Sequence, residues 1–132
     1  MGAGCLRGRT MSNVQLPPNI QERLARLQQL QSTLQSLLLQ KQRLDLELNE
    51  TERALKTLEG VSSETKVYRS VGAILVEKKR DELVKELTER KEFLEMRSKV
   101  IEKQEKKTRE RLTSLQRTLQ KELSQGAAPG GP

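Results

Sequence analysis

The sequence predicts an all-α dominated fold, a long antiparallel coiled-coil hairpin with a small β-hairpin at the connection between its two helices. Leucines recur at helical spacing on both sides of the chain's middle, and a short β-type run separates the two leucine-rich segments. Charged residues make up 33% of the chain and aromatic residues 2%, which favours helices that bury a seam over a globular core. Disorder is the competing interpretation, but disordered chains lack regularly spaced leucines.

The chain is expected to begin with a disordered extension over residues 1–16. This segment holds two glycine-containing clusters and basic residues, but no apolar periodicity. Met11 stands immediately before the more regular region, so we hypothesise that residues 1–10 reflect an upstream start or an added segment. The coiled-coil and β-hairpin domain is then expected over residues 17–125.

The first helix is predicted over residues 19–59. Asn19 follows a pair of prolines and can act as N-cap, and Glu22 completes a capping-box pattern. Gly60 is placed to follow the C-cap. From Leu30 onward the apolar steps alternate between four and three residues, as in a coiled coil. The stripe consists of Ile20, Leu24, Leu27, Leu30, Leu34, Leu37, Leu44, Leu48, Leu55 and Leu58, with Lys41 and Thr51 at two polar seam positions.

The second helix is predicted over residues 81–124, with Asp81 as N-cap. Its main heptad position holds Leu87, Leu94, Ile101, Thr108 and Leu115. We expect the partner position to hold Arg90, Arg97, Gln104 and Arg111, which would make a weak seam. Phe93, Met96 and Val100 add further apolar surface. Residues 126–132 are rich in Gly, Ala and Pro and are expected to form a disordered tail.

The β-hairpin is predicted over residues 66–78, with Gly72 in its turn. A lone two-stranded hairpin is marginally stable and leaves two edges unpaired. It could fold back on its own helices, or strands from several subunits could join in an intersubunit β-barrel that removes the edges. We favour the barrel. The expected subunit-assembly residues are Val67, Tyr68, Val71, Gly72, Ile74, Leu75 and Val76.

The two helices are nearly equal in length, so their free ends are expected to lie together. Leucines gather on both helices near those ends, where they can pack in the seam or offer apolar surface to a non-native chain. The expected client-binding residues are Leu24, Leu27, Leu34, Leu38, Leu115, Leu119 and Leu123.

Composition argues against an enzyme and against a cofactor or metal site. The chain has no His, Cys5 is its only cysteine, and no phosphate-binding loop is present. The net charge of +7 suggests nucleic acid, an anionic membrane or an acidic protein as partner. Acids interrupt the basic residues and base-stacking aromatics are missing, so we expect a solvated helix face and neither a nucleic-acid nor a membrane partner. A cytoplasmic location is the default expectation.

Several stretches together resemble a known family. The stretches are Leu16-Pro17-Pro18, Gln28-Gln29-Leu30-Gln31, Gln40-Lys41-Gln42, the segment 46–55, the hairpin segment 67–76, Leu87, Glu89-Arg90-Lys91 and Lys103-Gln104-Glu105. The chain is similar to the β-type subunits of prefoldin, a hexameric co-chaperone, of the archaeal sort. The acidic run into Thr51-Glu52-Arg53, followed by the Tyr-Arg-Ser-Val-Gly hairpin, is the specific part. The extension before Met11 and the Gly/Pro tail depart from the family pattern.

The resemblance implies a function that the periodicity does not show. Two α-type and four β-type chains would assemble through their hairpins into a double β-barrel platform that carries six coiled coils. The coiled-coil ends would hold unfolded proteins without ATP, as a holdase does, and pass them to a group II chaperonin. A single hairpin fits the β-type. The alternative function is a coiled-coil adaptor or scaffold without chaperone activity, and a basic nucleic-acid accessory protein is a third.

Overall fold

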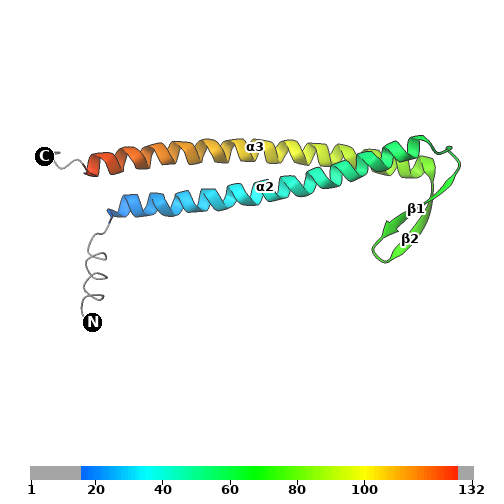
Figure 1. Cartoon of the computed structure of the whole chain (residues 1–132), viewed down its shortest axis with the longest axis horizontal. Coiled ribbons are helices and arrows are strands. Elements are labelled where there is room, and N and C mark those ends of the chain that lie inside the picture. The colour runs from blue at the N-terminus through cyan, green and yellow to red at the C-terminus, as the bar shows by residue number, and fades with distance from the viewer. Residues whose placement is uncertain (1–15, 128–132) are drawn as a thin grey trace. The chain divides into compact units, whose positions relative to one another are not determined.

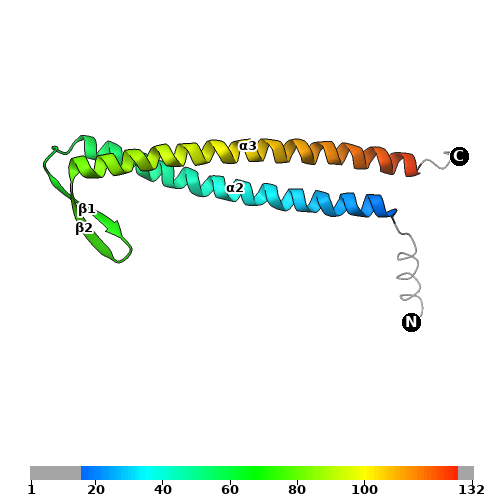
Figure 2. The same cartoon turned by 180° about the vertical axis from the view of Figure 1, so that it is seen from behind.

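The structure is a computed structural model that describes residues 16–127. Its elements follow in the order α2 (Pro18–Glu59), β1 (Lys66–Val71), β2 (Ile74–Lys79) and α3 (Arg80–Ala127) (Figure 1; Figure 2 gives the reverse view). The predicted fold class, two long helices with a small antiparallel β-hairpin between them, is confirmed. Within the described residues, no helix has a stretch long and apolar enough to cross a bilayer.

The limits of the predicted flanking segments can be compared only in part with the structure. Residues 1–15 and 128–132, on which most of the expected disorder falls, lie outside the described residues. α3 continues to Ala127, so it extends past the boundary that we expected after residue 125. Alanine is the best helix former and a single glycine costs only about 1 kcal/mol, so the sequence there does not compel the helix to stop.

The described chain divides into two compact units. The hairpin unit covers Gln35–Lys107, and the terminal unit combines the described residues up to Leu34 with those from Thr108 onward. In the hairpin unit α2 and α3 run antiparallel, because Lys41 pairs with Glu102 at 3.5 Å whereas the later Glu47 pairs with the earlier Arg90. These pairs are partly exposed to solvent and contribute little stability.

Burial of leucines and isoleucine at heptad spacing holds the hairpin unit together. Leu94 and Ile101 of α3 are only 1% and 2% exposed, and each such side chain stabilises the fold by about 1.5–3 kcal/mol. Thr51 is buried in the same seam, where its hydroxyl donates a hydrogen bond to the Glu47 carbonyl at 2.8 Å. The other buried residues of this unit are Leu37, Leu58 and Leu83.

The second seam position of α3 differs from the one that we expected. Lys91, Ser98 and Glu105 are half-buried, whereas the expected residues are all exposed. Those exposed residues are Arg90, Arg97, Gln104 and Arg111. Positions three and four residues from a heptad leucine are both candidates for the seam, and polar residues at both leave no apolar signal to choose between them.

The start of α2 in the terminal unit also differs from the prediction. The Pro17 carbonyl accepts hydrogen bonds from the amides of Ile20 and Gln21, both at 3.0 Å, so the helix begins at Pro18 and Asn19 is not its N-cap. Proline suits the first helical position because its fixed φ is helical and its missing N–H has no intrahelical partner there. The Asn19 side chain instead donates to Glu122 of α3 at 3.2 Å. Ile20, Thr108 and Leu119 are the buried residues of this unit.

The end of α2 does not use Gly60 as a left-handed cap. Among the described residues, only Gly72 has a positive φ. The amides of Gly60 and Val61 instead donate to carbonyls three residues earlier, at 3.3 and 3.1 Å, which tightens the last turn. The Arg80 guanidinium also donates to the Leu58 carbonyl at 2.9 Å, so a side chain from α3 helps to satisfy the end of α2.

Candidate functional site

The register of the hairpin gives it two distinct faces. Strands β1 and β2 pair antiparallel, and the last pair, Val71 with Ile74, leaves Gly72 and Ala73 as a two-residue turn. Gly72 has φ +58° and Ala73 has no positive φ, which fits a type II′ turn. Side chains alternate between faces along each strand. The inner face holds Val67, Arg69, Val71, Ile74, Val76 and Lys78, and the outer face holds Lys66, Tyr68, Ser70, Leu75, Glu77 and Lys79.

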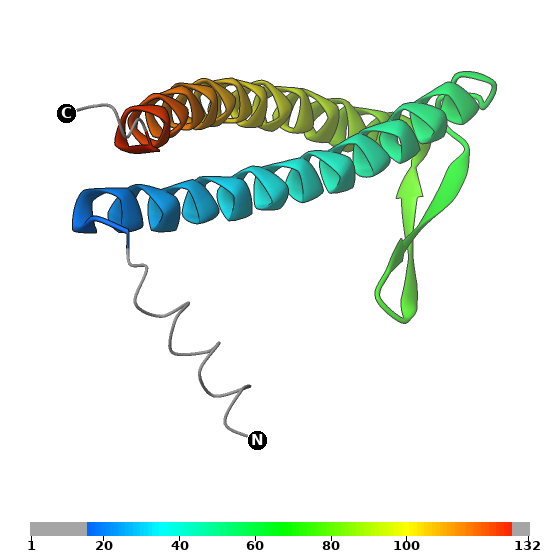
Figure 3. The ribbon, with the colours of Figure 1, turned by 60° about the vertical axis from the view of Figure 1, so that its left-hand side comes forward.

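The inner face is attached to α3 through one carboxylate. The Arg69 guanidinium of β1 donates to Glu86 of α3 at 2.8 Å, and the Lys78 ammonium of β2 pairs with the other oxygen of the same carboxylate. Val67, Val76 and Lys78 are half-buried on this face. Figure 3 shows the hairpin projecting from the connected ends of α2 and α3. We call Arg69, Lys78 and Glu86 the hairpin clamp.

The hairpin clamp lowers the pKa of Glu86 below its ordinary value. The hydrogen bond from Lys78 is the main cause, and the charge of Lys78 and the Arg69 guanidinium act in the same direction, whereas desolvation opposes them. A depressed carboxyl pKa stabilises the folded state above the unfolded pKa, and that contribution is lost as pH falls through the folded pKa.

The outer face and the turn end of the hairpin expose a group of large apolar side chains. Tyr68, Ile74 and Leu75 are 61%, 62% and 70% exposed, and Val71 is also exposed. The Tyr68 hydroxyl donates to Glu77 at 3.3 Å across the strands. The sheet has only two strands in the described chain, so each strand has an edge without a partner strand.

The seven expected assembly residues therefore lie together on one hairpin but in two environments. Val67 and Val76 are half-buried on the inner face, the face on which Arg69 and Lys78 contact Glu86 of α3. The other five residues are exposed. Sequence reasoning missed the hairpin clamp, because Arg69 and Glu86 are far apart in the sequence and neither belongs to a local motif.

The expected client-binding leucines lie in more varied places. Leu38 belongs to the hairpin unit and is half-buried, whereas the other six belong to the terminal unit. Among those six, Leu119 is only 4% exposed and packs in the seam, and Leu123 is 43% exposed. Leu24, Leu27, Leu34 and Leu115 are half-buried. Leu123 is thus the most accessible of the set, and Leu119 could contact another chain only if the two helices separated.

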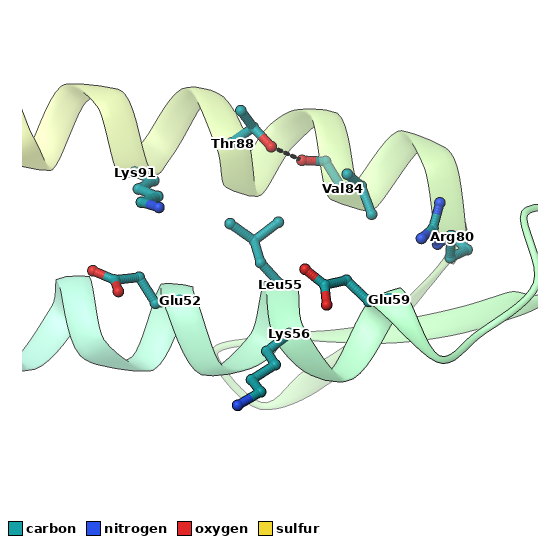
Figure 4. Close-up of a pocket in the computed structure, with 8 residues that line it drawn as sticks. All are labelled: Glu52, Leu55, Lys56, Glu59, Arg80, Val84, Thr88 and Lys91. Atoms are coloured by element: carbon teal, nitrogen blue, oxygen red, sulfur yellow. Dashed lines mark hydrogen bonds between the residues drawn. The ribbon is translucent and has the colours of Figure 1, made fainter.

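A groove of about 420 Å³ runs between the two helices in the hairpin unit (Figure 4). Its α2 wall consists of Glu52, Leu55, Lys56 and Glu59, and its α3 wall of Arg80, Val84, Thr88 and Lys91. Acids and bases are mixed along it, and the Thr88 hydroxyl is engaged with the Val84 carbonyl at 2.7 Å. In the described part of the chain, no three His, Cys, Asp or Glu residues group closely enough to hold a metal ion.

Two long helices joined by a single antiparallel β-hairpin define the class of protein. Residues 21–126 match the family described as "Prefoldin subunit". The chain is 46% identical over 110 residues to the prefoldin subunit beta of Archaeoglobus fulgidus, covering 83% of this chain and 95% of that protein. The corresponding protein of Pyrobaculum islandicum is 42% identical over 110 residues, covering 83% and 88%.

Solved structures show the same likeness. The crystal structure of the prefoldin beta subunit from Thermococcus strain KS-1 matches with a TM-score of 0.73 and 38% identity, covering 83% of this chain and 96% of that one. The beta2 subunit from the same source matches with a TM-score of 0.62 and 27% identity, covering 69% and 97%. The chain belongs to the prefoldin subunit family, as its residues predicted. This is a family of co-chaperone subunits.

Proposed function

We propose that this chain is the β-type subunit of an ATP-independent holdase. Its hairpin would join those of α-type partners and further β-type copies in a barrel of two α-type and four β-type chains. Leucines of the terminal unit would contact unfolded polypeptides, which the cytoplasmic complex would pass to a group II chaperonin. The observation that carries the proposal is the set of apolar side chains exposed on a two-stranded sheet with open edges.

The exposed hairpin surface supports assembly energetically. Tyr68, Ile74 and Leu75 are each more than 60% exposed in the single chain. Full burial of a large apolar side chain contributes about 1.5–3 kcal/mol, so covering these residues in a barrel would yield several kcal/mol per hairpin. Neighbouring strands would also pair the open backbone edges.

The hairpin clamp also supports assembly, because it positions the hairpin on its own helix. Arg69 and Lys78 come from different strands and converge on Glu86 of α3, so the hairpin has a defined position on the helix before any partner arrives. A pre-positioned binding element loses less conformational freedom when it associates. Val67 and Val76 on the inner face are half-buried, whereas Tyr68, Ile74 and Leu75 are exposed and would be available to partners.

Client contact is supported by the apolar side chains of the terminal unit. Leu123 is exposed, and Leu24 and Leu27 are half-buried, so these leucines offer apolar area without first unfolding a buried core. Apolar side chains on a helix can bind many unfolded sequences, because apolar burial is non-directional. The buried Leu119 contributes to the seam in this arrangement.

The test is suppression of aggregation of heat-unfolded citrate synthase by the assembled complex, without nucleotide. Substitution of Leu24 and Leu123 by Ser should reduce suppression while the complex keeps its mass and helical content. The matched control replaces Leu39, which is 53% exposed but lies in the hairpin unit, by Ser. A wild-type complex that assembles yet leaves aggregation unchanged would contradict the holdase proposal and favour a coiled-coil scaffold.

A further inference from the structure

The half of α3 that faces away from α2 carries an apolar patch outside both regions discussed above. Phe93, Met96 and Val100 are 51%, 69% and 46% exposed. The seam of the same helical segment is fixed by the buried Leu94 and Ile101. On a helix with 3.6 residues per turn, Met96 lies nearly opposite this seam, and Phe93 and Val100 lie on the adjoining flank. We call them the outer apolar patch.

Four lysines lie further along the outer side of the helix, two of them (Lys103 and Lys107) in the same row as Met96 and Val100. The four are Lys99, Lys103, Lys106 and Lys107, all of them exposed. Two acids, Glu102 and Glu105, lie between Lys99 and Lys107, and the exposed Glu95 precedes this stretch. Glu102 pairs with Lys41 of α2 at 3.5 Å, and Glu105 is half-buried on the seam side. These four lysines, which we call the lysine row, make the outer side of α3 predominantly positive between Lys99 and Lys107.

We propose that the outer apolar patch and the lysine row form one client-binding subsite for unfolded segments that carry apolar residues next to acidic ones. The face extends from Phe93 to Lys107, about 21 Å along the helix at 1.5 Å per residue. This subsite rests on the holdase function proposed above, and the proposal names the class of client segment that the surface selects. Apolar contact supplies affinity, and complementary charge supplies the preference and speeds the encounter.

The positive charge of the lysine row favours an acidic segment as the occupant of this face. Lysine ammonium groups on long flexible stems can follow a mobile chain, and their methylenes extend the apolar contact. The exposed Leu39 and Leu46 of α2 provide an internal comparison. Between them stand Lys41, which pairs with Glu102, and Arg43 and Asp45, so that apolar surface has mixed charge and no equivalent of the lysine row.

The local chemistry disfavours a nucleic acid on this face. Single-stranded nucleic acids bind through aromatic rings on which bases stack, combined with basic residues. Phe93 is the only aromatic residue here, and the Arg90 guanidinium lies 5.3 Å from its ring centroid and covers one side of the ring. The same guanidinium is bonded to both carboxylate oxygens of Glu47, which holds it in place.

The test measures binding of two fluorescein-labelled unstructured peptides to the assembled complex by anisotropy. The peptides have equal leucine content, and one carries glutamates where the other carries lysines. We expect the complex to prefer the acidic peptide and to lose that preference at high salt, because exposed charges are screened. Replacement of the four lysines by Gln should lower the affinity for the acidic peptide about tenfold at low salt, since each exposed ion pair contributes only modestly to binding. The same replacement should not lower the affinity for the basic peptide.

Two further variants locate the subsite. Substitution of Phe93, Met96 and Val100 by Ser should lower the affinity for both peptides. Substitution of Leu39 and Leu46 by Ser should leave the preference for the acidic peptide intact. Equal binding of the two peptides by wild type, or unchanged binding in the lysine-row variant, would overturn the subsite but not the holdase function. Absence of binding and of aggregation suppression in wild type would overturn both. A labelled oligodeoxythymidine that binds through the lysine row in place of the acidic peptide would also overturn the proposal.

Discussion

The turn of the hairpin offers the sharpest test of the local structure, through the substitution Gly72→Ala. Gly72 has φ +58°, and a Cβ atom placed there would meet no other atom within 4 Å. The substitution should therefore cost only backbone strain, which is about 1–2 kcal/mol for an L-residue in the left-handed region. That free energy corresponds to a factor of about 5–30 in the equilibrium between closed and open hairpin.

Gly60→Ala is the matched control, because the same chemical change meets a different backbone. Gly60 does not have a positive φ, and a Cβ atom there would lie 3.8 Å from the Thr57 carbonyl oxygen, an ordinary contact. Alanine restricts the unfolded chain, so this substitution should be neutral or stabilise by about 0.4–1 kcal/mol. Gly72→Asn should lie between the two, because asparagine tolerates positive φ better than alanine.

Amide hydrogen exchange of the strand residues is the appropriate assay, since the helices dominate any global signal. Protection of the ladder amides around Arg69 and Val76, which face each other in the register, should fall by about 5–30-fold in Gly72→Ala, while helix protection persists. Equal protection in Gly72→Ala, Gly60→Ala and wild type would refute the type II′ turn and the argument built on its strain.

Three other predictions follow from the seam, the hairpin clamp and the exposed leucine. Leu94→Ala should lower the free energy of unfolding by about 2–5 kcal/mol in urea titrations, because the side chain is 1% exposed, and a loss below about 1 kcal/mol would contradict its central place in the seam. Hairpin protection should be constant near neutral pH and fall only in acid, as pH passes down through the lowered pKa of Glu86, because protonation removes the charge that holds Arg69 and Lys78. Glu86→Gln should have low protection at neutral pH and lose this acid transition, and an identical pH profile in wild type and variant would show that the clamp does not hold the hairpin. Leu123→Ser should lower the free energy of unfolding by no more than about 1 kcal/mol, because the residue is already 43% exposed, and a loss above about 2 kcal/mol would place it in the seam.

The periodic and local features were the predictable part of this structure. Leucines at heptad spacing define the buried side of α2, and the buried Leu37, Thr51 and Leu58 all lie on that repeat. The hairpin was equally local, because a β-type run with one glycine leaves few positions for a two-residue turn. A glycine at φ +58° stands at the expected turn position.

Two predictions that were wrong concern helix ends at which two local structures compete. Pro18 and Asn19 both provide a plausible helix start, and the backbone uses the proline. Gly60 follows α2, yet it is not a left-handed cap. Hydrogen bonds to carbonyls three residues earlier, together with the Arg80 side chain, satisfy the end of the helix. Sequence spacing alone does not rank such alternatives, because each of them can satisfy the same unpaired backbone groups at the helix end.

The candidate site was predictable only as a set of apolar positions. The sequence places all seven assembly residues on the hairpin, but it does not tell which face contacts α3. That division depends on Glu86, which reaches both strands through space. Likewise Leu119 and Leu123 look equivalent in the heptad pattern, whereas one is buried in the seam and the other is exposed.

The central claim is that the exposed apolar side chains of the hairpin join subunits into one complex. Its most direct test is the native mass of this chain mixed with an α-type partner, for wild type and for the variant with Ile74→Asp and Leu75→Asp. Leu46→Asp is the matched control, because Leu46 is 64% exposed on α2 and lies outside the hairpin. We predict a hexamer for wild type and control, and only smaller species, with helical content retained, for the hairpin variant. A hairpin variant that still forms the hexamer would contradict the account.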